Sequence, residues 1–197
     1  KFQYFAKDTN VIVELVKKEN KDLPVFMIGH SMGGLITILY EIMYKGKLNG
    51  QILSAAVSGR PYNARGFKAE CQRILGTIMP HLKIQNPMYQ SIKKKNDDSI
   101  DELMLKKLSL HLCIELFIDG LDYIHNKISQ YNCPCLILHG TKDKMVSKEE
   151  SSNLYSSITS TDKKIKIYEG LGHELLKSRN KDLILNDIDN WIKRRIN

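Results

Sequence analysis

Residues 25–39 read VFMIGHSMGGLITIL, in which a serine among glycines separates two apolar runs. The first run predicts a short buried strand at Val25–Ile28, and the second predicts a helix that begins at Ser31. Gly29, Ser31 and Gly33 give the pattern Gly-x-Ser-x-Gly between a strand and a helix, which is typical of a nucleophile elbow. In such a turn the serine hydroxyl stands above the sheet, and we expect side chains two residues before and after the serine to clash.

The predicted helix adds electrostatic support for negative charge beside the serine. The first amide groups of a helix have no partner inside it, and the helix dipole places partial positive charge at the same end. The backbone N–H of Met32 is therefore a natural donor to an oxyanion. A glycine-rich turn without chemistry would give the same letters, but the flanking strand and helix favour a functional serine.

The remaining chain alternates apolar strands with helices. Continuous apolar strands in this order predict an α/β fold with a mainly parallel sheet and helices on both faces. Residues 60–130 show helical patterns and no good strand, so they are expected to form a helical insertion between core segments 1–59 and 131–197. The predicted helices are 8–19 (capped by Asp8 or Thr9), 31 to about 45, 148–157 and 182–194, and the predicted strands are 25–28, 52–58, 135–139 and 165–168.

A serine nucleophile needs a base, and the base needs an orienting acid. In this architecture both partners follow later strands, in the chain order serine, acid, histidine. Asp143 follows the strand CLILH, and His173 follows the strand in IKIYEG. The sequence therefore predicts that Ser31, Asp143 and His173 form a catalytic triad.

Other acids and histidines are weaker candidates for these roles. His139 ends a strand and is expected to be structural, and the side chain of His30 is expected to point away from the path of the serine. The remaining rivals lie in the predicted insertion, where none follows a sheet strand; they are His81, His111, His125, Asp119 and Asp122.

Composition narrows the possible partners. The net charge is +8, but the basic clusters are scattered and no aromatics interleave with them, so a solvated surface is favoured and no nucleic-acid partner is expected. The sequence does not decide whether the protein contacts an anionic membrane surface. The four cysteines lack zinc-site spacing and indicate buried thiols in a reducing, cytoplasmic compartment. We expect no metal and no organic cofactor, and the sequence does not indicate an oligomeric state.

Four stretches resemble the monoglyceride lipase and lysophospholipase branch of the α/β-hydrolases, which is of the serine aminopeptidase S33 type: LPVFMIGHSMGG, LHGTKDKMV, KIKIYEGLGHELL and the closing DIDNWI. The resemblance implies Ser31 as nucleophile, Asp143 as acid and His173 as base. It also implies that residues 60–130 form a cap over an acyl pocket, and that the substrate is a lipid ester such as a monoacylglycerol or a lysophospholipid.

Three alternatives remain open at this stage. One is a small-molecule carboxylesterase of the same fold, and another is a binding protein of this fold that has lost catalysis. The third is a serine aminopeptidase, which would use acidic residues such as Glu115, Asp119 and Asp122 to bind a free amine. The apolar surroundings of those acids favour a lipid substrate.

The chain departs from the family pattern before the elbow. Only 30 residues precede Ser31, and they lack the His-Gly motif whose neighbourhood supplies a second oxyanion N–H in the family. The resemblance therefore implies that the N-terminal strands of the fold lie outside this chain. We expect the strand at Val25–Ile28 to form an exposed apolar edge.

Overall fold

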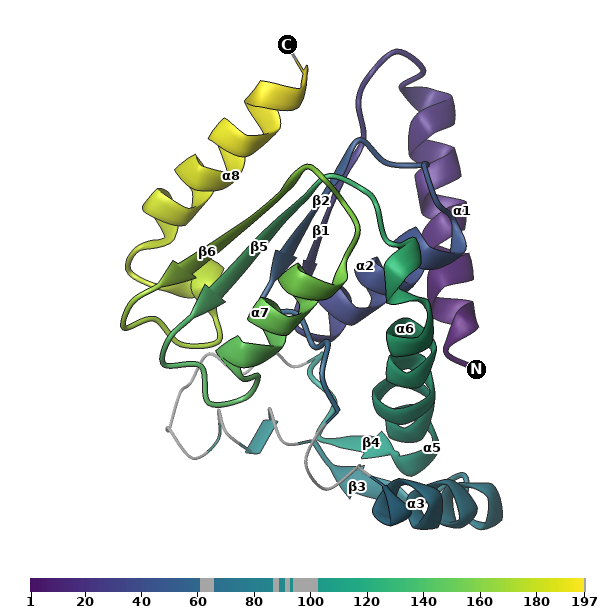
Figure 1. Ribbon diagram of the computed structural model, residues 1–197. Coiled ribbons are helices and arrows are strands. Elements are labelled where there is room, and N and C mark those ends of the chain that lie inside the picture. Colours follow the sequence, from purple (N-terminus) through teal and green to yellow (C-terminus); the bar gives the residue numbers. More distant parts are fainter. Residues whose placement is uncertain (61–65, 87–88, 91–92, 94–102, 197) are drawn as a thin grey trace. The chain divides into compact units, whose positions relative to one another are not determined.

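The structure is a computed structural model that describes all residues except 61–65, 87–88, 91–92, 94–102 and 197 (Figure 1). The chain forms two compact units. The sheet unit comprises residues 3–59 and 121–197, and the insertion unit comprises residues 1–2 and 60–120. Residues 121–127, which fall within the predicted insertion, thus belong to the sheet unit. Several positions of the predicted insertion lie outside the described residues.

The sheet unit is built on four parallel strands. They are β1 (Phe26–His30), β2 (Gly50–Ser54), β5 (Cys135–Gly140) and β6 (Lys163–Tyr168), and they lie in the order β1-β2-β5-β6. Every neighbouring pair is parallel, with His30 opposite Ser54 and Leu53 opposite Ile137. Strands β2 and β5 are buried along their whole length. The predicted α/β class and parallel sheet are therefore confirmed.

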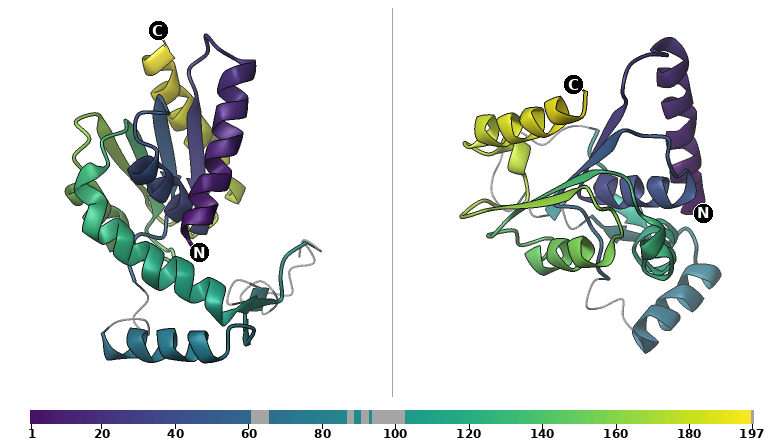
Figure 2. Two further views of the ribbon diagram at one scale, coloured as in Figure 1. Left: turned by 90° about the vertical axis from the view of Figure 1, so that its right-hand side faces the viewer. Right: turned by 45° about the horizontal axis from the view of Figure 1, so that its top comes forward.

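Helices cover both faces of this sheet. Helix α8 lies on one face, and α2 and α7 lie on the other, as the two further views also show (Figure 1, Figure 2). The helices of the sheet unit are α1 (Gln3–Glu19), α2 (Met32–Met43), α6 (Leu121–Lys127), α7 (Lys148–Ser157) and α8 (Lys181–Ile196), with single 3₁₀ turns at Ile128–Gln130 and Leu175–Lys177.

Alternate side chains of β1 lie on the sheet face that α8 covers. Trp191 of α8 meets Phe26 of β1 edge to face, with ring centroids 6.0 Å apart. Side chains alternate along a strand, so Ile28 and His30 lie on the same face as Phe26. Ile28 is nevertheless 50% exposed, and β1 pairs only with β2 among the described strands. The expected apolar edge is therefore present.

Helix α1 differs from the prediction in its start and in its buried face. It begins at Gln3 rather than near Asp8, and Thr9 lies inside it, with its hydroxyl bonded to the Phe5 carbonyl oxygen. The helix buries Ala6 and Val13. The apolar side chains that indicated a helical stripe are exposed instead: Val11, Ile12, Leu15 and Val16.

Helix α2 carries a carboxyl group into the core of the sheet unit. Glu41 is fully buried. Burial raises the pKa of this carboxyl from 4.5 to about 7, and the nearby Lys45 ammonium offsets only part of the effect. The folded chain therefore keeps a proton on Glu41 at pH values where the unfolded chain has lost it.

The free energy of unfolding is accordingly expected to fall as the pH rises from about 4.5 to about 7, by roughly 3 kcal/mol from this group. Glu41→Gln keeps a neutral side chain at every pH, so the variant should be more stable than the parent at pH 8 and similar to it at pH 4.5. Urea unfolding at both pH values measures the difference. Glu19→Gln, on the exposed side of α1, is the control and should show no such gain; an equal gain there would contradict the assignment to Glu41.

The insertion unit combines helices with a small antiparallel sheet. Its elements are α3 (Phe67–Ile78), β3 (Lys83–Gln85), β4 (Lys107–Ser109), α5 (Leu110–Ile114) and a π-helical turn at Glu115–Gly120. Strands β3 and β4 pair with Ile84 opposite Leu108, so the prediction that this region holds no strand is wrong. Each strand has three residues with one apolar side chain, which is too short to show a periodic pattern.

The core of the insertion unit is small and lies between α3 and the helical segment after β4. Ala69, Leu110, Ile114 and Ile118 form its buried cluster. Along α3 the apolar residues Ile74 and Ile78 are exposed. Among the described residues, no helix is long and apolar enough to cross a membrane.

Candidate active site

The turn between β1 and α2 has the strained backbone of a nucleophile elbow. Ser31 has φ 55°, a left-handed conformation that residues other than glycine rarely adopt. Two backbone hydrogen bonds to the neighbouring strand region hold it there. Ser31 N–H donates to the Ser54 carbonyl oxygen at 3.0 Å, and the Ser31 carbonyl oxygen accepts from Val57 N–H at 3.1 Å. Strain held in this way is common at functional sites.

The close contacts around the elbow involve Gly29 and Gly34 rather than Gly29 and Gly33. A Cβ on Gly29 would lie 2.3 Å from Thr37 Oγ1 and 2.6 Å from the Gly33 carbonyl oxygen. A Cβ on Gly34 would lie 2.4 Å from Ala56 Cβ, whereas one on Gly33 would meet no described atom within 4 Å. The expected clash two residues after the serine is therefore wrong. The helix turns its next residue, Gly34, toward the chain that follows β2.

Helix α2 begins at Met32, directly after the serine. The Met32 amide is thus in the first turn, where N–H groups have no partner inside the helix. Partial positive charge from the helix dipole lies at the same point. This is the position at which the sequence predicts an oxyanion donor.

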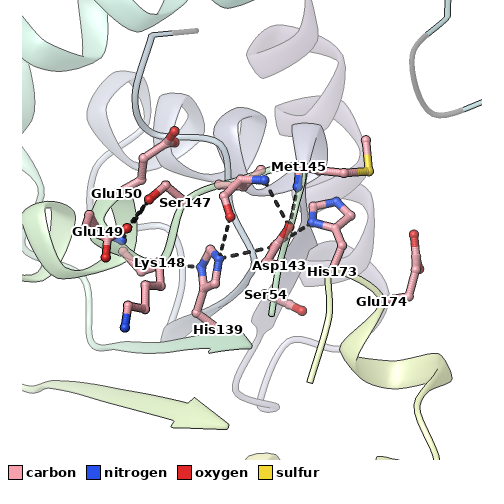
Figure 3. Close-up of polar contacts among 12 residues, drawn as sticks. Ser54, His139, Asp143, Met145, Ser147, Lys148, Glu149, Glu150, His173 and Glu174 are labelled. Carbon is pink, nitrogen blue, oxygen red and sulfur yellow. Dashed lines mark hydrogen bonds and ion pairs between the residues drawn. The ribbon is translucent and has the colours of Figure 1, made fainter. Parts of the chain in front are cut away.

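Asp143 and His173 are joined by a hydrogen bond, as the sequence predicts. His173 Nδ1 lies 2.8 Å from Asp143 Oδ2 (Figure 3). The second carboxylate oxygen, Oδ1, accepts from the backbone N–H groups of Met145 and Val146 at 2.8 and 3.0 Å. Both side chains are buried, so the pair is shielded from competing water.

His139 also contacts this carboxylate, which the sequence did not reveal. Its Nε2 lies 3.2 Å from Asp143 Oδ2 and 3.0 Å from the Val146 carbonyl oxygen, while its Nδ1 lies 2.7 Å from Ser151 Oγ (Figure 3). Burial alone would raise the pKa of Asp143. The hydrogen bonds from His139, His173 and the two backbone N–H groups outweigh burial and hold that pKa well below its ordinary value. Asp143 therefore stays ionised at neutral pH.

The parallel sheet places the three predicted residues on one side, at the carboxyl ends of its strands. Ser31 follows β1, Asp143 follows β5 and His173 follows β6, and the carboxyl ends of parallel strands meet at the same side of a sheet. His173 Nε2 is buried and has no hydrogen-bond partner among the described residues, so the structure does not join it to Ser31 Oγ. Catalytic hydrogen bonds of this kind are often long in the absence of substrate.

His30, which was predicted to point away from the path of the serine, lies beside His173. The two ring centroids are 4.8 Å apart. His30 Nδ1 lies 3.3 Å from Ser54 Oγ, and its Nε2 lies 3.7 Å from Glu174 Oε1. Alternation along β1 explains this, because His30 shares the face over which the chain after β6 passes. The same contacts bring in Glu174, which sequence reasoning did not single out although it adjoins His173.

Three of the acids and histidines considered as alternatives have partners elsewhere in the structure. Asp119 binds Arg73 at 2.7 Å inside the insertion unit. Glu115 accepts a hydrogen bond from the backbone N–H of Phe2 at 2.7 Å, in the same unit. His125 Nε2 lies 2.7 Å from the Ser58 carbonyl oxygen in the sheet unit.

Known proteins resemble this chain both in sequence and in fold. The chain is 28% identical to the human monoglyceride lipase over 202 residues, which is 98% of this chain and 66% of that protein. It is 24% identical over 192 residues to the monoacylglycerol lipase of Mycolicibacterium smegmatis, covering 95% of this chain and 69% of that protein. The crystal structure of the Paleococcus ferrophilus monoacylglycerol lipase superposes with a TM-score of 0.80 at 22% identity, covering 99% of this chain and 76% of that one.

The share of each protein that the matches cover determines what they establish about this chain. The chain spans about two thirds of the length of the human and mycobacterial proteins. The fold of the solved structure extends across nearly all of the present chain, which confirms the α/β-hydrolase architecture. The family described as serine aminopeptidase, S33, matches residues 1–180. The chain therefore belongs to the serine aminopeptidase S33 family of α/β-hydrolases.

Proposed function

We propose that this chain carries the catalytic machinery of a serine hydrolase that cleaves carboxylic esters of lipids, such as monoacylglycerols or lysophospholipids. The observation that carries the proposal is the buried Asp143–His173 hydrogen bond at 2.8 Å, at the same sheet edge as a serine held at φ 55°. Two features there support an acyl-transfer site: an ionised acid fixes one nitrogen of the histidine, and the other nitrogen has no hydrogen-bond partner among the residues that the structure describes.

In the proposed reaction His173 Nε2 accepts the proton of Ser31 Oγ as that oxygen attacks the ester carbonyl carbon. The carbonyl oxygen becomes an oxyanion beside the Met32 N–H at the start of α2. His173 then gives the proton to the departing alcohol, which leaves an acyl group on Ser31. Water repeats the sequence and releases the fatty acid. Asp143 stabilises the imidazolium at each stage.

The lipid part of the proposal rests on the relatives. The human and mycobacterial proteins are named for monoacylglycerol hydrolysis. The S33 family name itself refers to an aminopeptidase, which keeps peptide hydrolysis as the second candidate. Against it, Asp119 and Glu115, two of the three acids that could bind a free amine, already have partners in the insertion unit.

An activated serine can be tested directly. A fluorophosphonate should add one phosphonate per chain, detected by intact mass, and Ser31→Ala should abolish the addition. Ser54→Ala is the matched control, because Ser54 is the buried serine opposite His30 in the next strand, and it should still be labelled. An unlabelled parent chain would mean either that the binding-protein alternative holds or that labelling requires the second oxyanion N–H of the family pattern.

The substrate class needs a separate comparison. We expect a medium-chain monoacylglycerol to be hydrolysed faster than an amino-acid anilide at equal concentration. Faster release of the anilide would overturn the lipid proposal while leaving the serine mechanism intact. Cleavage of a short aryl ester that is faster than cleavage of either of these two substrates would favour the small-molecule carboxylesterase alternative.

A further inference from the structure

Two imidazoles and a carboxylate converge beside the proposed site. Potential ligand atoms of His30, His173 and Glu174 all lie within 4.8 Å of one another. We propose that these three side chains bind a divalent transition-metal ion, Zn²⁺ above all, and that the bound ion blocks the proposed general base. Two histidines and one glutamate form a known protein ligand set for zinc, with a fourth position left for water.

The contacts of the two imidazole rings leave both Nε2 atoms available as metal ligands. His173 Nδ1 is bonded to Asp143, and His30 Nδ1 lies 3.3 Å from Ser54 Oγ. Both Nε2 atoms are buried and lack a hydrogen-bond partner among the described residues. Because the ionised Asp143 accepts the proton of His173 Nδ1, Nε2 of that ring presents a lone pair. A carboxylate that fixes the outer nitrogen of a histidine is the usual second shell of a zinc ligand.

Glu174 supplies the negative charge and the route of entry. A glutamate carboxyl is ordinarily ionised at neutral pH. His173 is only 8% exposed, whereas the Glu174 side chain is 39% exposed and can admit an ion from solvent. Lys177 Nζ lies 3.7 Å from Glu174 Oε2 and is a mild competitor on the outer side.

The three ligands must move slightly to hold an ion. Zinc–nitrogen bonds of about 2.1 Å in a tetrahedral site set ligand atoms about 3.4 Å apart, so a separation of 4.8 Å must shrink by roughly 1.4 Å. The half-exposed Glu174 side chain needs only a small rotation to approach His30. Its Oε1 starts 3.7 Å from His30 Nε2.

Metal binding and catalysis would exclude each other, because both need the lone pair of His173 Nε2. The inhibitory effect rests on the proposed function, but binding of the ion does not. Zn²⁺ should therefore slow fluorophosphonate labelling of Ser31, and a chelator should restore it.

The test measures Zn²⁺ binding by titration calorimetry, without substrate. The background is Cys71→Ser, because Cys71 is an exposed thiol that could bind zinc by itself. We expect one equivalent of Zn²⁺ to bind, with affinity reduced at least tenfold by Glu174→Gln and by His30→Asn. Glu169→Gln, an exposed carboxyl group at the end of the same strand–loop region, is the matched control and should not change the affinity.

A spectroscopic probe checks the ligands independently. Co²⁺ in the same site should give visible absorption bands without the near-ultraviolet charge transfer of a cysteine thiolate. Three results would overturn the proposal: no binding of Zn²⁺, a thiolate signature in the Co²⁺ spectrum, or Zn²⁺ binding that neither substitution weakens. Urea unfolding shows first that each variant is folded. A chain that binds Zn²⁺ as expected but is never labelled would overturn the proposed function alone.

Discussion

Replacing Asp143 with asparagine is expected to lower kcat for ester hydrolysis about 10⁴-fold. Asp143 Oδ1 accepts two backbone N–H groups, and Oδ2 accepts from His173 and His139. An amide offers one oxygen and one NH₂ group. If the oxygen stays with the backbone, the NH₂ group faces His173 Nδ1 and favours the tautomer whose Nε2 carries the proton. That tautomer cannot take the proton of Ser31.

The control for this experiment is Asp119→Asn. Asp119 is the rival acid of the insertion unit, where it binds Arg73, and its replacement should leave kcat essentially unchanged. Steady-state kinetics on a medium-chain ester, with urea unfolding of each variant, separates lost catalysis from lost folding. Near-parental turnover by folded Asp143→Asn, or a comparable loss in Asp119→Asn, would show that the acid has been misassigned.

The second large effect is expected at Gly34. Its alanine variant would bring Cβ within 2.4 Å of Ala56 Cβ and 2.8 Å of Ala56 Cα. Neither atom belongs to a flexible side chain, so α2 and the chain after β2 must separate. We expect the free energy of unfolding to fall by about 3 kcal/mol, the upper part of the range for overpacking. Urea unfolding measures the change.

Gly33→Ala is the matched substitution at the neighbouring position. Gly33 lies in the first turn of α2, and an added Cβ there meets no described atom. Alanine is the better helix former, so this variant should equal or exceed the parent in stability, by up to about 1 kcal/mol. Equal losses of unfolding free energy in the two variants would show that position 33 requires glycine, as the Gly-x-Ser-x-Gly pattern indicates.

The sheet and the order of the proposed triad were predictable because they depend on local signals. The strand CLILH, for example, is a continuous apolar run, and such runs in parallel strands are buried on both faces. Asp143 could be assigned because it follows this strand, and His173 because it follows β6, where apolar residues alternate with lysines. Their hydrogen bond then follows from the parallel arrangement, which brings the ends of distant strands together.

The features that were missed depend on contacts that no sequence pattern shows. His139 binds Asp143 only because the turn after β5 folds back over the strand. The clash at Gly34 arises from Ala56, which follows another strand, so no pattern around Ser31 could reveal it. Strands β3 and β4 stabilise each other across the insertion and carry little periodic signal of their own. In each case the contact depends on how the backbone folds, which no periodic pattern in the sequence shows.

The pairing of β2 with β5 has a consequence for folding kinetics and for change during evolution. Gln51 lies opposite Cys135, so the sheet closes only when the whole segment between these strands has been looped out. Such non-local pairing slows folding. The closure entropy, however, grows only logarithmically, and doubling a loop costs only about 0.6 kcal/mol. Residues 60–120 are therefore where insertions and deletions cost the sheet least, and where descendants of this chain can diverge most freely.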